Sequence, residues 1–261
     1  MKFFYTFIVF IIFVTSVNTA DTRLDTIKKT GKLRVCVWPE YYGISYVDTR
    51  TQQLSGIDVD LAKELAKDLG TTPVFVKSSF ATLIDDVTTE RCDIAMFAIG
   101  HTPERAAKIR LTSAHISSDI YAITTKDNKR VKSWNDIDKK GVVVAVAKGT
   151  YHESVMRTKL KNATLSVVAN LHAREQEVES GRADVFMTDY PFGMLMLSKT
   201  SWAKLLKPER AYHITEYGWA VKYGDDIFFE RIEKFLRDIK KDGRLQKAAK
   251  DNSLEAIVNL K

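Results

Sequence analysis

Several features that define other classes of protein are missing from this chain. After residue 20 no hydrophobic run reaches membrane length, so we expect the rest of the chain not to span a membrane. The 40 basic and 33 acidic residues leave a net charge of +7, but no long basic run and no aromatic-basic motif is present, and we expect no nucleic acid partner. The five histidines include no H-x₃-H pair, and we expect neither a metal nor a cofactor.

Cysteine is also scarce, since only Cys36 and Cys92 occur. An exported chain permits a disulfide between them. We place Cys36 late in one predicted strand and Cys92 at the start of another, and parallel strands would hold the two at different heights. We therefore expect two buried free thiols that behave as small hydrophobic residues.

The N-terminal segment differs from everything that follows. Residues 1–20 contain Lys2, an apolar run over residues 3–14, and small or polar residues up to Ala20. This order predicts a secretory signal peptide that is cleaved after Ala20. Asn18 is a poor residue two places before the cleavage site, so an uncleaved membrane anchor is the alternative.

Strand and helix patterns alternate along the chain. Apolar, β-branched runs predict strands, and apolar residues at helical spacing predict helices between them. The predicted strands lie at 32–38, 72–79, 93–99, 119–125, 142–147, 164–169, 183–190 and 217–224, with helices at 56–70, 80–92, 151–161 and 173–181 and a helical C-terminal segment after residue 224. This order predicts an α/β fold with mostly parallel sheets flanked by helices, and such sheets bind ligands at the carboxyl ends of their strands.

One of those carboxyl ends carries the segment Gly100–Arg105. A hydroxyl and an arginine stand there at the start of a predicted helix, an arrangement that can bind a carboxylate. The alternative is structural, with Thr102 as the helix cap and Pro103 in the first helical turn. The turn Gly149-Thr150 occupies the equivalent place in the second half of the chain. Two such halves facing each other would form a cleft with anion-binding groups on both walls.

Five ordered motifs now carry a resemblance to a known family. They read LDTIKKTGKLRV, LSGIDVDLAKELAKDLG, RCDIAMFAIGHTPERAAKIRLTSAH, VVVAVAKGTYHE and VESGRADVFMTD. In this order and spacing, the chain resembles the family 3 extracellular solute-binding proteins, which are periplasmic amino-acid-binding components of ABC importers. The resemblance runs from about Asp21 to about Leu254.

The resemblance implies a two-lobed periplasmic-binding-protein clamp of type II, in which two hinge strands join the lobes. Lobe one would comprise residues 21–117 and 218–261, and lobe two residues 118–217. The expected protein is a periplasmic monomer. It would deliver a small ligand, a polar or aromatic amino acid or a close derivative, to an ABC permease in the inner membrane.

The resemblance also implies roles for particular residues. Arg105 would bind the α-carboxylate of the ligand and Asp189 its α-ammonium group, since a zwitterion needs one partner of each charge. The remaining expected ligand-binding residues are Gly100, Thr102, Gly149, Thr150, Tyr151, Tyr41, Phe80, Ala98 and Trp38. Asp189 could instead, or in addition, cap a helix, and Tyr41 and Phe80 could simply pack within their lobe.

The chain departs from the family pattern in its side-chain pocket. Ala98 lies in a strand end that is usually serine-rich, and Trp38 stands where receptors for basic amino acids often carry an acid. Glu40 could still supply a negative charge. We therefore expect a more aromatic pocket than in lysine or histidine receptors, and the identity of the ligand stays open.

Two other functions share this clamp. The family includes cyclohexadienyl dehydratase, which acts on prephenate or arogenate with a catalytic acid three residues after the ammonium-binding aspartate. Here that residue is Phe192, which cannot transfer a proton, so we expect no enzyme activity. His101 and His152 are near the expected cleft, where they could titrate, but we interpret them as polar lining or surface groups. A sensory receptor domain is the third possibility.

Overall fold

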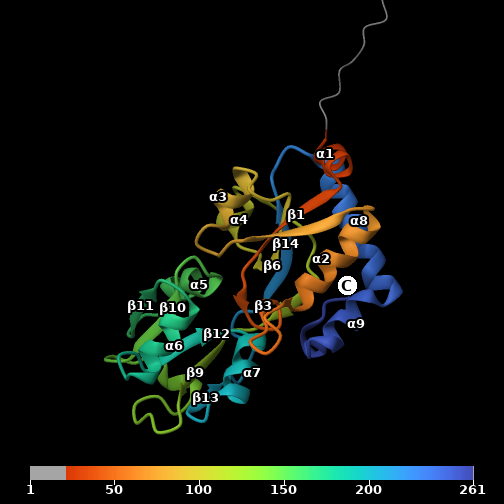
Figure 1. Ribbon diagram of the computed structural model, residues 1–261. Helices are drawn as coiled ribbons and strands as arrows, with labels where there is room; N and C mark the ends of the chain where they lie inside the picture. Colours follow the sequence, from red (N-terminus) through yellow and green to blue (C-terminus); the bar gives the residue numbers. More distant parts are fainter. Residues whose placement is uncertain (1–21, 261) are drawn as a thin grey trace, which may run out of the picture.

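The computed structural model describes residues 22–260, so the expected signal peptide at residues 1–20 lies outside the described residues. Two lobes are visible in Figure 1, each built around its own β-sheet. This is the expected α/β clamp. Among the described helices, none is long and apolar enough to cross a membrane.

Lobe one contains a mixed sheet with the strand order β5-β1-β6-β14-β7, and β8 lies beside β14. β1 is parallel to β5 and β6, whereas β14 is antiparallel to β6, β7 and β8. Its strands are β1 (Lys32–Val37), β5 (Thr72–Lys77), β6 (Ile94–Gly100), β7 (Arg110–Leu111), β8 (Ile116–Ser118) and β14 (Thr215–Val221). The helices of this part are α1 (Arg23–Thr30), α2 (Ile57–Asp68), α3 (Leu83–Thr88), α4 (Pro103–Ala106), α8 (Asp226–Asp242), α9 (Arg244–Asp251) and the 3₁₀ turn η2 (Glu255–Ile257).

Lobe two contains a sheet with the order β11-β10-β12-β9-β13. The first three strands are parallel, and β9 is antiparallel to both of its neighbours. Its strands are β9 (Tyr121–Thr125), β10 (Val143–Ala147), β11 (Thr164–Val168), β12 (Val185–Thr188) and β13 (Ala203–Leu206), and its helices are η1 (Trp134–Asp136), α5 (Tyr151–Lys159), α6 (Leu171–Glu179) and α7 (Tyr190–Lys199). The central parallel strands of both lobes are therefore the ones that periodicity predicted.

The sequence patterns did not predict the shortest strands. A small antiparallel sheet of β2 (Glu40–Tyr41), β3 (Ser45–Val47) and β4 (Leu54–Ser55) follows β1, and β7, β8 and β13 were also not predicted. Strands of two to four residues are too short to show a clear alternation of side chains. The small sheet matters because it positions Tyr41 toward the second lobe.

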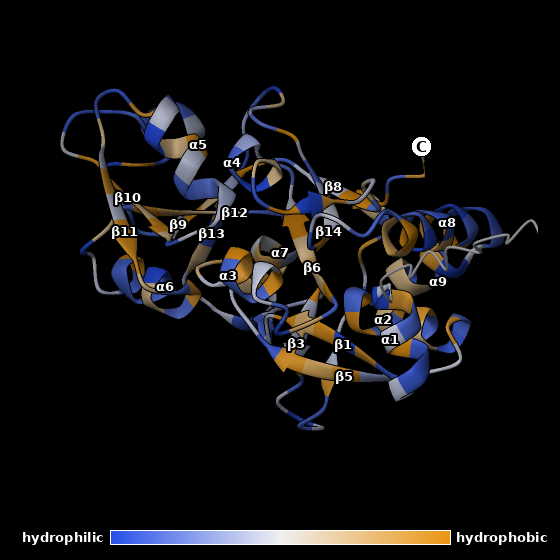
Figure 2. Cartoon of the chain, turned by 90° about the horizontal axis from the view of Figure 1, so that it is seen from above, coloured by the Kyte–Doolittle hydropathy of each residue, from blue (hydrophilic) through white to orange (hydrophobic). Residues whose placement is uncertain are grey.

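Hydrophobic side chains fill each lobe. All seven residues of β6 are buried, and Figure 2 shows most of this strand as hydrophobic. α8 buries five residues at helical spacing, namely Phe228, Ile232, Phe235, Leu236 and Ile239. This stripe packs the C-terminal helices on lobe one, and it lies in the helical segment predicted after residue 224.

The motif GIDVD at the start of α2 ties three elements of lobe one together. Gly56 has φ +123°, and a Cβ there would lie 2.3 Å from the carbonyl oxygen of Ile44, so only glycine fits. Asp58 is fully buried and accepts hydrogen bonds from the backbone N–H of Ala98 (2.6 Å) and the indole N–H of Trp219 (2.8 Å). His115 Nε2 also lies 2.8 Å from its carboxylate.

The expectation of two free thiols is wrong. Cys36 and Cys92 form a disulfide with a Cα–Cα distance of 5.5 Å. Cys36 lies in β1, but Cys92 lies in the bend before β6 rather than on the strand. Cys92 therefore does not stand on the parallel ladder of β1 and β6, and the expected difference in height between the two cysteines does not apply.

Two chain segments run between the lobes side by side. β8 leads from lobe one towards β9, and β14 returns from lobe two. The two pair antiparallel, with Ile116 opposite Tyr217 and Ser118 opposite Thr215. The expected lobe boundaries at 117/118 and 217/218 fall within this pair.

Candidate ligand-binding site

Two neighbouring cavities lie where the lobes meet. The outer cavity has a volume of about 380 Å³ and is lined by Phe80, Ala81, Leu83, Ile84, Thr102, Glu104, Arg105, Gly149, Thr150, Tyr151, Glu153, Ser154 and Arg157. The inner cavity has a volume of only about 10 Å³ and is lined by Trp38, Tyr41, Phe80, Thr150, Tyr151, His152, Leu171, Arg174, Thr188, Asp189 and Phe192. Phe80, Thr150 and Tyr151 line both cavities. All of the expected site residues except Gly100 and Ala98 thus line these cavities, but they are divided between two compartments.

Arg105 lies on the outer cavity and links the two lobes. Arg105 is 5% exposed, and its guanidinium donates to the carbonyl oxygens of Gly100 (Nη1, 2.8 Å) and Gly149 (Nη2, 3.0 Å). Burial lowers the pKa of Arg105 to about 10, so the side chain is charged at neutral pH. Two of the five N–H donors of an arginine are used by these carbonyls, and within residues 22–260 no carboxylate forms a hydrogen bond with Arg105.

The segment before Arg105 has both of the roles considered from the sequence. Thr102 caps α4, because its hydroxyl accepts from the backbone N–H of Arg105 at 3.3 Å, and Pro103 occupies the first turn. Thr102 also lines the outer cavity. The cap therefore orients Arg105 toward the cleft, and the two roles coexist.

Gly149 brings lobe two into close contact with lobe one. Its φ is +77°, and a Cβ at this position would lie 2.8 Å from the carbonyl oxygen of Phe80 and 2.9 Å from the Cα of Ala81. Real Cβ atoms do not approach backbone so closely, so the residue must be glycine for the lobes to meet here. Thr150 follows at the start of α5, but its hydroxyl donates to Ala147 rather than into a cavity.

Asp189 lies on the inner cavity and carries the charge opposite to that of Arg105. It is 1% exposed, follows β12 and caps α7 by accepting from the backbone N–H of Phe192 at 3.3 Å. The hydroxyl groups of Tyr41 and Tyr217 donate to its Oδ2. Burial raises the pKa of the Asp189 carboxyl above its usual value, although the hydrogen bonds from Tyr41 and Phe192 and the charge of Arg174 act in the opposite direction. Within residues 22–260 its hydrogen-bond partners are uncharged.

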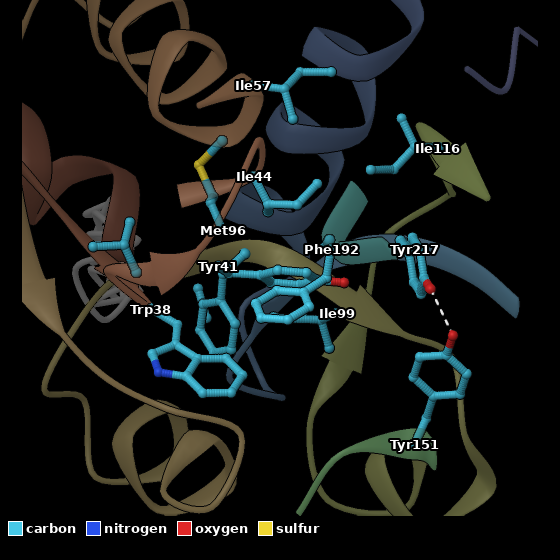
Figure 3. Close-up of a cluster of buried hydrophobic side chains, with 14 of the residues drawn as sticks. Trp38, Tyr41, Ile44, Ile57, Met96, Ile99, Ile116, Tyr151, Phe192 and Tyr217 are labelled. Atoms are coloured by element: carbon cyan, nitrogen blue, oxygen red, sulfur yellow. Dashed lines mark hydrogen bonds between the residues drawn. The ribbon is translucent and has the colours of Figure 1, made fainter. Parts of the chain in front are cut away.

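Aromatic rings form one wall of the inner cavity. The centroids of Trp38 and Phe80 are 5.0 Å apart, and those of Tyr41 and Phe80 are 5.9 Å apart. Figure 3 shows Trp38, Tyr41 and Phe192 close together, and the hydroxyl of Tyr151 pointing to that of Tyr217 at 2.8 Å. These rings occupy most of the space, which explains why the inner cavity holds about the volume of one water molecule.

Three expected positions do not line a cavity. Gly100 contributes only its carbonyl oxygen to Arg105. Ala98 is buried in β6 with φ +49°, and its N–H is bound by Asp58. Glu40 is exposed in β2, so the suggestion that it supplies charge to the pocket is wrong for this arrangement. The reason is the unpredicted hairpin of β2 and β3, which turns alternate residues inward and outward.

Arg174, which lines the inner cavity from α6, was not predicted as a site residue. A signal was present, because Leu171, Arg174 and Val178 share one helical face and are all buried. An arginine between two apolar residues of a buried stripe points inward. His152 also lines the inner cavity, and burial followed by the charge of Arg174 holds its pKa well below the usual value. His101 lies outside both cavities.

A two-lobed α/β clamp with opposite charges facing the cleft defines a ligand-binding receptor class. Residues 33–252 match the family described as bacterial extracellular solute-binding proteins, family 3. The chain belongs to that family.

Individual relatives include both binding proteins and an enzyme. The chain is 28% identical to cyclohexadienyl dehydratase of Pseudomonas aeruginosa over 88% of its length and 86% of the relative. It is 27% identical to the L-cystine-binding protein TcyA of Bacillus subtilis, over 89% and 85% of the two chains. Among solved structures, the ancestral amino acid-binding protein AncCDT-1, a precursor of cyclohexadienyl dehydratase, has 32% identity and a TM-score of 0.80, covering 87% of this chain and 98% of that one.

Proposed function

We propose that this protein captures an α-amino acid, or a close derivative, in the cleft between its lobes and delivers it to an ABC importer. Arg105 binds the α-carboxylate, with help from the N–H groups at the start of α5, and Asp189 binds the α-ammonium group. Trp38, Tyr41 and Phe80 provide the aromatic wall against the side chain.

One observation carries this proposal. Arg105 and Asp189 are both buried at the lobe interface, yet within residues 22–260 their hydrogen-bond partners are all uncharged groups, and the nearby Arg174 acts on Asp189 through charge without a hydrogen bond. A buried charge without a directly bonded opposite charge is costly, by several kcal/mol in order of magnitude. A zwitterion supplies such a partner to both residues at once.

Binding requires movement of the lobes and of Tyr41. The inner cavity of about 10 Å³ is too small for an amino acid, and the Tyr41 hydroxyl holds the Asp189 carboxylate. The paired segments β8 and β14 are the proposed hinge, with lobe boundaries at 117/118 and 217/218. Opening at this hinge separates Gly149 from Phe80 and exposes Arg105 and Asp189. Closing over the ligand restores the contact between Gly149 and Phe80.

The proposed function is ligand binding without catalysis. Phe192 occupies the position where the dehydratase branch was expected to carry its acid, and it is buried against the inner cavity. Purified protein incubated with prephenate should give no phenylpyruvate above the uncatalysed rate. Steady turnover that scales with protein concentration contradicts this part of the proposal.

Export to the periplasm, a monomeric state and docking on a permease complete the proposal. The family relationship supports an extracellular location. The sequence of residues 1–20, which predicts a signal peptide, supports secretion, and the mature N-terminus should be found near Asp21 by mass spectrometry of the exported protein. A product that retains Met1 in the membrane fraction contradicts cleavage.

A ligand screen tests the central function. Thermal unfolding is followed with each of the twenty amino acids, L-cystine and prephenate. A ligand at one hundred times its Kd stabilises the protein by about 2.7 kcal/mol, so a true ligand gives a clear rise in Tm. If none of these compounds raises the Tm, the amino-acid clamp is contradicted.

A further inference from the structure

Arg174 is held rigidly in the inner wall of lobe two. Its residue is 1% exposed, and Nη1 donates to the carbonyl oxygen of Met187 at 2.7 Å. The guanidinium carbon lies 4.5 Å from the ring centroid of Phe186 and 4.6 Å from that of Phe192. One nitrogen and the flat faces of the guanidinium are therefore engaged by lobe two itself.

The opposite edge of the same guanidinium is not engaged. Nε and Nη2 of Arg174 are buried and have no hydrogen-bond partner within residues 22–260, and the same is true of the Thr188 hydroxyl. Both residues line the inner cavity. The N–H groups of Nε and Nη2 point along one edge of an arginine, and this edge matches the two oxygens of a carboxylate.

The carboxylates near Arg174 do not occupy its unpaired N–H groups. These carboxylates are Glu175 and Asp189, and both act on Arg174 through charge without a hydrogen bond. Asp189 is already bound by two tyrosine hydroxyls and a backbone N–H. Leaving buried donors unpaired is unfavourable, and a ligand that reaches them recovers that cost.

We propose that Arg174, with the Thr188 hydroxyl, binds a second carboxylate of the ligand. The inference rests on the proposed function, because Arg105 and Asp189 are taken to bind the α-carboxylate and the α-ammonium group. It narrows the ligand to an acidic amino acid or a related compound with two carboxylates. A cationic side chain is excluded, because it would meet the Arg174 guanidinium in a closed cavity.

A purely structural role is the competing explanation. Arg174 could simply attach α6 to β12 through Met187 and the two phenyl rings. Such a role affects stability but gives no preference between an acid and its amide. Selectivity is therefore the informative measurement, rather than affinity alone.

The experiment uses L-glutamate with L-glutamine and L-aspartate with L-asparagine, each titrated by calorimetry into the whole protein and its variants. In the parent protein at least one acid should bind at least tenfold more tightly than its amide. In Arg174→Gln this preference should fall below threefold through weaker binding of the acid, and Arg174→Lys should restore part of it. Arg182→Gln is the matched control, since Arg182 is an exposed arginine of the same lobe paired with Glu177, and it should keep the parent preference.

The outcomes separate the inference from the function beneath it. If the parent binds each amide as tightly as its acid, or if a folded Arg174→Gln keeps the preference, the role of Arg174 is refuted. If the parent binds only amino acids with one carboxylate, the inference fails while the proposed clamp stands. If no compound of the full screen binds, both fail.

Discussion

Each lobe places one buried arginine at the cleft, and the two are used differently. Arg105 of lobe one and Arg174 of lobe two are nearly inaccessible, and burial lowers the pKa of both to about 10. Arg105 donates across the interface to Gly149, whereas Arg174, among the described residues, donates only to Met187 within its own lobe. Arg105 thus joins the two lobes, whereas Arg174 leaves one edge of its guanidinium, with unpaired N–H donors, facing the inner cavity.

The lobes also differ in how they are held together. Lobe one carries the disulfide Cys36–Cys92, and lobe two contains no cysteine because the sequence has only these two. The wall that holds Arg105 is cross-linked covalently, whereas the wall that holds Arg174 and Asp189 depends on packing and hydrogen bonds. Stability and binding should therefore respond separately to changes in the two lobes.

The largest expected effect on the binding wall of lobe two comes from Asp189→Asn. Asparagine caps a helix as well as aspartate does, so α7 should be preserved, but an amide cannot balance an ammonium group. Removing one partner of a buried charged pair costs about 2–5 kcal/mol, which corresponds to about thirtyfold to several thousandfold weaker binding. Calorimetry with the ligand found by screening measures this loss of affinity.

Thr49→Ala is the control for this change, because Thr49 is exposed in a loop away from both cavities. It should alter the affinity by less than threefold. An Asp189→Asn variant that binds as well as Thr49→Ala would remove Asp189 from the site.

Loss of the disulfide should affect the stability of lobe one without affecting ligand affinity. The bond closes a sequence separation of 56 residues, and such a cross-link contributes about 2–4 kcal/mol, mainly by restricting the unfolded chain. The variant Cys36→Ala/Cys92→Ala should lose about that much unfolding free energy in urea, while its Kd stays within threefold of the parent. An unchanged unfolding midpoint contradicts the role assigned to the bond.

Gly149→Ala should weaken closure by a smaller amount. A left-handed backbone costs a residue with a Cβ roughly 1–2 kcal/mol, and here the Cβ also meets the backbone of Phe80 and Ala81. We expect about tenfold weaker binding. Gly141→Ala is a matched control, because Gly141 has φ +86° and a Cβ there would meet nothing within 4 Å. Equal affinities of the two variants contradict the contact between the lobes.

The central strands and the strand-end position of Arg105 could be predicted from the sequence because their signals are local. β6 is an unbroken apolar run, and Gly100–Arg105 follows it directly, so the strand end and its charged group are adjacent in the chain. Asp189 also follows a strand, β12, but its expected role came from the family resemblance. Parallel topology then brings these strand ends to the cleft.

What could not be predicted depends on contacts between distant segments. Tyr41 reaches Asp189 across 148 residues through a hairpin of very short strands. Cys92 reaches Cys36 because the chain bends before β6. Arg174 resembles an ordinary surface arginine in a polar helix until its stripe with Leu171 and Val178 is noticed, and only the sheet beneath α6 shows where that stripe points.

Calorimetric titration of Arg105→Ala tests the central claim most directly. The ligand identified by the screen is titrated into the parent, Arg105→Ala and Thr49→Ala under the same conditions. Without the guanidinium a desolvated carboxylate keeps only backbone donors, and at about 2–5 kcal/mol the affinity should fall by about thirtyfold to several thousandfold. If Arg105→Ala binds within threefold of the parent, Arg105 merely holds the lobes together, and the carboxylate clamp is contradicted.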